Sequence, residues 1–353
     1  MSRVFSYPAA IFFSVSTIVF ALTFARFGTG KRVLTPKVEL SLGGATSWLN
    51  TKPLDLAALR GKVVLIEFWT YTCINWRRTL PYTRQWALKY KDHGLVVVGV
   101  HTPEFSFEQK LKNVSRAIDE MNISYPVALD NNFKIWNSFR NQYWPALYLI
   151  DAKGKLRYEK FGEGDYAETE QQIQKILKEA SAKIATDIVN VQPDGFEAAA
   201  DWDHLRSPEN FLGYSRTAGF ASPQGIVTDK RVLYSPPKQL KLNHWALSGM
   251  WIMGKEHVRL SKGQGKIIYR FHARDLHLIL GPAVPGTYIK FRVLIDGKPP
   301  GLANGLDIDS SGNGTVSEQR MYQLIRQQGP VVERQFEIEF LGPEVEVYDF
   351  TFG

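Results

Sequence analysis

Two continuous apolar runs, separated by one helix-length segment, constrain the fold of this chain more than any other feature. The first covers residues 63–68, and the second lies in "GLVVVGVHT", residues 94–102. Runs that are apolar throughout are typical of strands buried on both faces of a sheet. Between them, residues 73–91 mix apolar and charged side chains and end near Gly94, as a helix would. This order predicts a βαβ unit.

The same alternation of apolar strand-like runs and helical segments continues to about residue 183. Helices are predicted at residues 106–120 and 133–140, with the strand "YPVAL" between them. The stretch "YWPALYLIDAKGKLRYEKFGEGD" predicts two strands joined by the turn "DAKGK". A last helix is predicted to begin at Asp165, with Glu168 at the spacing of a capping box. The first part of the chain is therefore predicted to be α/β.

From about residue 195 the helical periodicity disappears. Short alternating stretches such as "KIIYRFHA", "YIKFRVLID" and "VEVYDFTFG" are separated by Gly and Pro. This pattern predicts an all-β sandwich, or jelly roll. The predicted organisation is a signal anchor or signal peptide at 1–27, a linker at 28–39, the α/β domain at 40–183, a linker at 184–198 and the β-sandwich domain at 199–353.

The N-terminus predicts export. Residues 9–25 carry no charge and are flanked by Arg3 and Arg26. Their length lies between that of a signal-peptide core and a minimal membrane span of about 17 residues. We expect an apolar N-terminal helix retained as a membrane anchor, with the domains facing the periplasm or the extracellular side. Cleavage after Ala25, in "TFA", is the alternative.

Composition excludes several functions. The net charge of +8 comes without a dense Lys/Arg run or an RNA-binding fingerprint, so no nucleic-acid partner is expected. One cysteine, Cys73, rules out an intrachain disulfide and a multi-thiolate zinc site. Residues 307–318 have the spacing of a calcium-binding EF-hand loop, but Gly314 occupies the aliphatic position and no amphipathic helix precedes it. A polar loop is the default there, and neither metal nor cofactor is expected.

Cys73 is the candidate nucleophile. It lies in "WTYTCINWRR", where it follows the first predicted strand and opens a helix. Unpaired backbone N–H groups and the helix dipole favour a thiolate at such a position, and Arg77 and Arg78 add positive charge. The residues predict an activated thiol, with an inert buried cysteine as the alternative.

The segments "GKVVLIEFWTYTCINW", "GVHTPE" and "YWPALYLID" together resemble the thioredoxin-like (redoxin) domain of DipZ-type and TlpA-type exported thiol-disulfide proteins, over residues 40–182. The active turn of that family reads C-x-x-C. Cys73 matches the first, attacking cysteine, whereas Trp76 stands in place of the second.

The resemblance assigns roles to three further residues. Pro145 matches the cis-proline that faces the thiol and offers a backbone edge to the substrate; an ordinary trans proline is the alternative. Glu67 matches the buried acid beneath the turn, a possible proton relay, or else a strand-end residue that reaches water. Trp69 matches the aromatic residue that precedes the turn.

The missing second thiol determines the predicted chemistry. Without it, a mixed disulfide on Cys73 persists until an external thiol arrives. We therefore expect a monothiol oxidoreductase acting on protein or low-molecular-weight disulfides and thiols. One alternative is a redox-inactive binding or scaffold protein. Another is a thiol-dependent peroxidase, because Thr70 gives the T-x-x-C spacing of peroxiredoxins, although Ile66 replaces their proline.

The segments "SPENFLGYSR", "HWALSGMW" and "YDFTFG" resemble the C-terminal jelly-roll domain of DipZ-type proteins, which is likened to carbohydrate-binding domains. The resemblance makes a glycan a possible partner, with Tyr214, Trp245 and Trp251 as stacking platforms; packing in the core is the alternative. The resemblance does not include a multi-span electron-importing domain, so a separate membrane protein would have to donate electrons.

Overall fold

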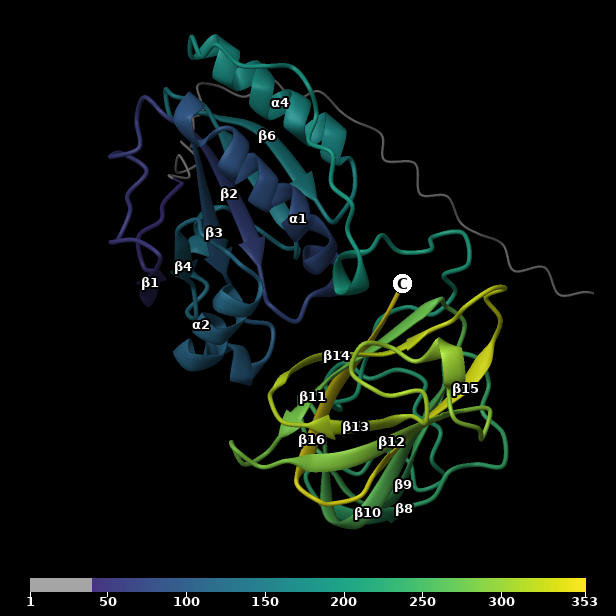
Figure 1. Cartoon of the computed structure of the whole chain (residues 1–353). Coiled ribbons are helices and arrows are strands. Elements are labelled where there is room, and N and C mark those ends of the chain that lie inside the picture. Colours follow the sequence, from purple (N-terminus) through teal and green to yellow (C-terminus); the bar gives the residue numbers. More distant parts are fainter. Residues whose placement is uncertain (1–39) are drawn as a thin grey trace, which may run out of the picture. The chain divides into compact units, whose positions relative to one another are not determined.

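The first apolar run forms a central strand of a six-stranded sheet in the computed structural model, which describes residues 40–353 (Figure 1). This strand, β2 (Val63–Trp69), is buried along its whole length. It pairs in parallel with β3 (Leu95–His101) and antiparallel with β5 (Ala146–Ile150). Helix α1 (Ile74–Lys89) connects β2 to β3, so the predicted βαβ unit is confirmed.

The strand order of this sheet is β1-β4-β3-β2-β5-β6. The remaining strands are β1 (Ser47–Leu49), β4 (Val127–Leu129) and β6 (Leu156–Phe161). The remaining helices are η1 (Lys91–His93), η2 (Ser106–Gln109), α2 (Leu111–Glu120), α3 (Lys134–Ser138) and α4 (Tyr166–Glu179). The helix predicted at 106–120 is thus two helices, because Lys110 between them has an extended backbone, with φ −74° and ψ 115°.

Alternate residues of β2 supply two apolar clusters, one on each face of the sheet. Leu65 and Trp69 pack with side chains of α1, α2 and α4. Ile66 and Phe68 pack with side chains of α3 on the other face. Glu67 shares the parity of Leu65 and Trp69, so its carboxylate is directed into the cluster that contains α1.

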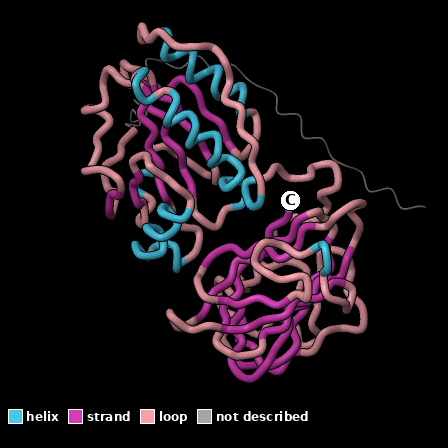
Figure 2. The backbone as a smooth tube through the Cα atoms, viewed as in Figure 1, coloured by secondary structure: helices cyan, strands magenta, loops and turns pink. Residues whose placement is uncertain are grey.

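The second domain is built from strands. They are β7 (Asn210–Phe211), β8 (Arg231–Tyr234), β9 (Trp245–Met253), β10 (Val258–Phe271), β11 (Asp275–Pro282), β12 (Ile289–Ile295), β13 (Asn313–Val316), β14 (Arg320–Arg326), β15 (Arg334–Phe340) and β16 (Val345–Phe352). The short helices η3 (Gly195–Glu197) and η4 (Gly301–Ala303) complete the set. Figure 2 shows that strands and loops make up nearly all of this domain.

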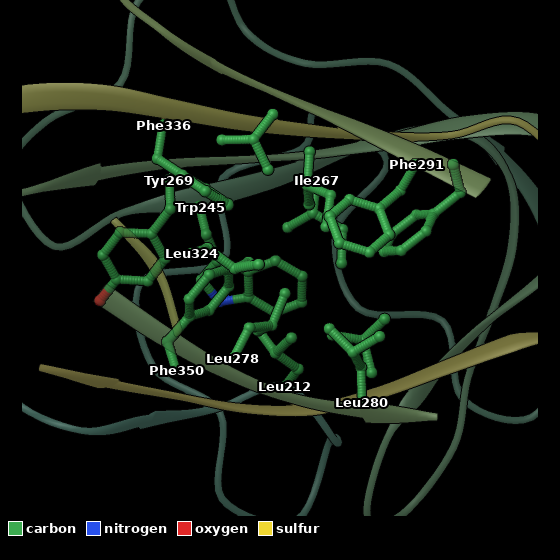
Figure 3. Close-up of a cluster of buried hydrophobic side chains, with 14 of the residues drawn as sticks. Leu212, Trp245, Ile267, Tyr269, Leu278, Leu280, Phe291, Leu324, Phe336 and Phe350 are labelled. Atoms are coloured by element: carbon green, nitrogen blue, oxygen red, sulfur yellow. The ribbon is translucent and has the colours of Figure 1, made fainter. Parts of the chain in front are cut away.

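These strands form one ten-stranded sheet that curls around a large apolar core. Strand β10 pairs with β16 at Val258 and Arg259, but with β15 from Gly265 to Phe271. Figure 3 shows side chains from several strands meeting in this core, among them Trp245 and Phe350. The all-β class is confirmed as a large curled sheet, and the jelly-roll arrangement stays a prediction.

The described residues belong to one compact unit, so the contacts between the two domains are part of the fold. The Tyr348 ring of β16 packs against Phe105 and Phe107, with ring centroids 5.3 and 4.7 Å apart. Arg216 forms a 2.8 Å ion pair with Glu104.

The predicted N-terminal helix and anchor lie outside the described residues. Within residues 40–353, no helix combines the length and the apolar character needed to cross a bilayer.

Candidate active site

Cys73 lies at the start of α1, as the sequence predicts. It is the N-cap residue, with an extended backbone, and its carbonyl accepts the N–H of Arg77 at 3.0 Å. Its side chain is half-buried. The Sγ atom lies 3.8 Å from the carbonyl oxygen of Trp144, and the Trp144–Pro145 peptide bond is cis. The structure therefore brings the thiol and the proline-bearing loop together.

The loop before Cys73 is held by a buried acid that the sequence analysis missed. The Thr72 hydroxyl donates to Glu108 at 2.5 Å, and the other Glu108 oxygen accepts the N–H groups of Glu104 and Phe105 at 2.7 and 2.9 Å. Burial raises the pKa of Glu108 to about 7, against the lowering effect of these donors. The only signal in the sequence is an acid three residues after Phe105, where a capping residue would lie.

Trp76 belongs to the interior. Its ring is fully buried and stacks on Trp69, with the ring centroids 4.3 Å apart and 23° between the planes.

Glu67 accepts hydrogen bonds from Thr83 at 2.8 Å and Tyr125 at 3.0 Å. Burial raises the pKa of Glu67 to about 7, while Thr83, Tyr125 and Trp76 lower it. The reading of Glu67 as a residue that reaches water is therefore wrong, and its role as a relay stays a prediction.

The Thr70 hydroxyl is turned toward the interior. It lies 3.4 Å from Nε2 of His101, and both residues are buried. Burial lowers the pKa of His101 to about 3, so this imidazole is neutral at physiological pH. Thr70 thus has a structural partner beneath the turn, and its peroxidatic role stays a prediction.

The electrostatic environment of the thiol differs from the prediction. Burial raises the pKa of Cys73 well above its ordinary value, and the charges of Glu209 and Glu104 raise it further. Backbone N–H groups at the start of α1 lower the pKa, as expected, but by less than burial raises it. The expectation of a thiolate was wrong because the sequence did not show that protein would surround the sulfur.

The two arginines of α1 have other partners. Arg78 forms a buried 3.0 Å ion pair with Glu163 and donates to the carbonyl of Phe352 at 3.3 Å. The Arg77 guanidinium lies 5.0 Å from the ring centroid of Phe196. Neither is among the groups that shift the thiol pKa most.

The sugar-binding prediction is wrong for both tryptophans. Trp245 and Trp251 are fully buried in the core of the β domain, so neither ring face can meet a sugar. Their indole N–H groups donate to the carbonyls of Ala218 and Ser248, at 3.0 and 2.9 Å. Tyr214 is partly exposed, and its hydroxyl donates to Asp229 at 3.3 Å. Its sugar contact stays a prediction.

The calcium alternative has no support in the described residues. Asp307 is paired with Arg320 at 2.6 Å, and Asp309 accepts the N–H groups of Ser311 and Asn313 at 2.9 Å. A strand, β13, occupies the second half of the loop. No group of acidic, His or Cys side chains within residues 40–353 is arranged to hold a metal ion.

Comparison with known proteins identifies the class to which both domains belong. Residues 36–159 match the AhpC/TSA family, and residues 207–353 match the family described as "Thioredoxin like C-terminal domain". The first domain is therefore a thioredoxin-like α/β domain, and the β domain that follows it matches the family with that description.

The relatives include Protein DipZ. The DipZ sequences of Mycobacterium bovis and Mycobacterium tuberculosis are 40% identical to this chain over 266 residues, which is 74% of this chain and 37% of each relative. The chain thus spans little more than a third of their length. Thiol-disulfide oxidoreductase YkuV of Bacillus subtilis is 28% identical, over 41% of this chain and 95% of that protein. These similarities confirm the resemblance and make the chain a homologue of thioredoxin-fold thiol-disulfide oxidoreductases.

Proposed function

We propose that this protein is a monothiol thiol-disulfide oxidoreductase with Cys73 as its nucleophile. The observation that carries the proposal is the position of the Cys73 sulfur. It lies at the first turn of α1 and 3.8 Å from the carbonyl that precedes cis-Pro145. A substrate disulfide that meets this edge would have the thiol beside it, and the similarity to YkuV and DipZ supports exchange chemistry.

The exchange has two steps. The Cys73 sulfur attacks one sulfur of R–S–S–R′, the Cys73–S–S–R bond forms, and the electron pair of the broken S–S bond leaves on R′S⁻. An external thiol then attacks the adduct, takes R as a new disulfide and releases Cys73 as a thiol. Trp76 leaves the chain without a resolving sulfur, because Cys73 is its only cysteine.

A second candidate is a binding protein without redox turnover. The observation that favours it is the raised pKa of Cys73, because a thiol kept protonated at neutral pH attacks disulfides slowly. The two candidates predict different rates for the formation of a mixed disulfide on Cys73.

The test is the formation of an adduct with oxidised glutathione, followed by intact mass spectrometry of the full chain. We expect one glutathione on Cys73, accumulating because nothing in the chain resolves it, and removed by added reduced glutathione. The Cys73→Ser variant is the control. Native protein that stays unmodified, while unfolded protein reacts, would favour the binding candidate.

We extend the proposal to location. The uncharged segment at 9–25 would hold the protein at a membrane after export, with a separate membrane protein as a possible electron donor. Fractionation of cells that express the full chain tests this: we expect the protein in the membrane fraction, released by detergent and not by salt. Recovery in the cytoplasmic fraction would contradict the extension.

A further inference from the structure

A cavity of about 290 Å³ lies beside the active turn, where the two domains meet. Tyr71, two residues before Cys73, and Arg77 of α1 line it from the α/β domain. Arg320 and Met321 of β14 line it from the β domain. The volume is close to the lower end of the range of about 300–1,000 Å³ that ligand pockets occupy, so the cavity suits a small molecule. The proposed function does not use it.

Arg77 presents an unsatisfied donor to this cavity. Its Nε atom is buried, and that N–H group has no acceptor among residues 40–353. The guanidinium is held 5.0 Å from the ring centroid of Phe196. Burial lowers the pKa of Arg77 to about 10, so the side chain keeps its charge at neutral pH. Glu197, the acid whose charge acts on it most, is paired with Arg84 at 2.7 Å. A buried donor of this kind normally meets protein, water or an ion.

The carboxylates of the cavity wall are engaged with other arginines. Glu120 pairs with Arg116 at an N–O distance of 3.4 Å, and Asp307 pairs with Arg320 at 2.6 Å. All four of these residues line the cavity together with Arg77. The wall therefore holds three guanidinium groups against two carboxylates, and the excess positive charge belongs to Arg77. One anion would complete the site.

The rest of the wall is apolar or aromatic. Ala117, Met121 and Met321 are buried, and the rings of Tyr71 and Phe196 complete the surface. An inorganic ion would leave these side chains in contact with water, whereas an organic body would cover them. The guanidinium fork matches a carboxylate through two parallel hydrogen bonds. This combination favours a small organic carboxylate over an inorganic anion.

We propose that this cavity binds a small organic carboxylate, with Arg77 as the residue that holds the anion. The side chain of Glu120 in its wall is 55% exposed, so a ligand can enter from solvent on the side of α2. Because Arg77 and Met321 belong to different domains, the bound ligand contacts both domains and stabilises their junction. The inference goes beyond the exchange chemistry at Cys73 and does not rest on it.

The test uses benzoate and benzamide as probes, since they share a ring and a shape but only benzoate is an anion. Binding to the full-length chain is measured by isothermal titration calorimetry at constant ionic strength. We expect benzoate to bind saturably, and benzamide at least about tenfold more weakly, because it lacks the charge-assisted hydrogen bonds to Arg77. Inorganic phosphate has the charge without the apolar body and should also bind more weakly than benzoate. This comparison needs no variant.

The variants locate the site. Arg77→Gln should lower the benzoate affinity at least about tenfold. Arg77→Lys keeps the charge without the fork and should recover part of the affinity. Arg292→Gln removes the same charge at an exposed position of β12 and is the matched control, with unchanged affinity. Saturating benzoate should raise the midpoint of thermal unfolding of the wild type and of the control, but not of Arg77→Gln.

Three results would count against this assignment. Equal affinities for benzoate and benzamide, or unchanged benzoate affinity in folded Arg77→Gln, would overturn the role of Arg77. Inorganic phosphate that binds as tightly as benzoate would contradict the organic body of the ligand. The lack of saturable binding of every probe would overturn the site itself. Adduct formation at Cys73 is measured separately, so each of these results leaves the monothiol function standing.

Discussion

At the scale of single residues, Trp76 has two consequences. It removes the resolving sulfur, and its ring fills interior volume against Trp69. The sequence allowed Trp69, Trp76 and Pro145 to be placed around the active turn, because they lie in ordered motifs near Cys73. It could not give the raised pKa of the thiol, because burial of the sulfur, its main cause, and the charge of Glu209 both depend on the tertiary structure. Asp349, an acid inside the apolar strand "VEVYDFTFG", was a signal in the sequence for a buried carboxyl group.

The Trp76→Ala variant should be strongly destabilised. Removing a fully buried tryptophan leaves a cavity, so we expect the free energy of unfolding to fall by about 3–5 kcal/mol. Urea unfolding followed by circular dichroism measures it. The matched control is Trp202→Ala, since Trp202 is 59% exposed, and it should cost less than about 1 kcal/mol. Equal losses in the two variants would contradict the interior role of Trp76.

Glu67 should make stability depend on pH. Its pKa is 4.5 in the unfolded reference and about 7 in the fold, so its favourable contribution is complete below pH 4.5 and is lost as the pH rises through 7. Between pH 5 and pH 8 the wild type should lose up to about 3 kcal/mol more than Glu67→Gln. Glu159→Gln, at an exposed position of β6, is the control. Parallel pH curves for the wild type and Glu67→Gln would refute this assignment.

At the scale of secondary-structure elements, the sequence was most informative where the apolar pattern was strong. Strands β2 and β3 and helix α1 lie where their patterns predicted them. The break at Lys110 was missed, because no helix breaker marks it in the sequence. The backbone of Lys110 is extended, and it ends the short helix η2, whose Glu108 side chain accepts the N–H of the N-cap residue Phe105. Alternation likewise indicated strands in the second domain, but not that β10 pairs with β16 and then with β15.

Helix η2 and the turn before Cys73 should both depend on Glu108. The Glu108→Ala variant leaves the Thr72 hydroxyl and the N–H groups of Glu104 and Phe105 without their acceptor in a buried place. We expect a loss of about 2–3 kcal/mol in the free energy of unfolding, and faster hydrogen exchange at both amides. Glu120→Ala, at an exposed position of α2, loses only its ion pair with Arg116, worth about 0.5 kcal/mol. Unchanged exchange at these amides would exclude this role of Glu108.

At the scale of the whole molecule, the contacts between domains should make unfolding cooperative. The Tyr348 ring packs on Phe105 and Phe107, so Tyr348→Ala removes apolar contact from both domains at once. We expect one calorimetric transition in the wild type and two in this variant, together with faster proteolysis within residues 184–198. Tyr288→Ala is the control, because Tyr288 is 75% exposed. Two transitions in the wild type itself would show that the domains are energetically independent.

The place of Glu209 in the second domain has a consequence for biosynthesis. Domains generally fold from the N-terminus while translation continues, so the α/β domain presents Cys73 before β16 has been made. For that interval the sulfur lacks the charge of Glu209, which the second domain contributes and which raises the pKa of the thiol. The thiol in the nascent chain is therefore expected to be more acidic than the same thiol in the finished protein, and it reaches its final pKa only after the second domain has folded.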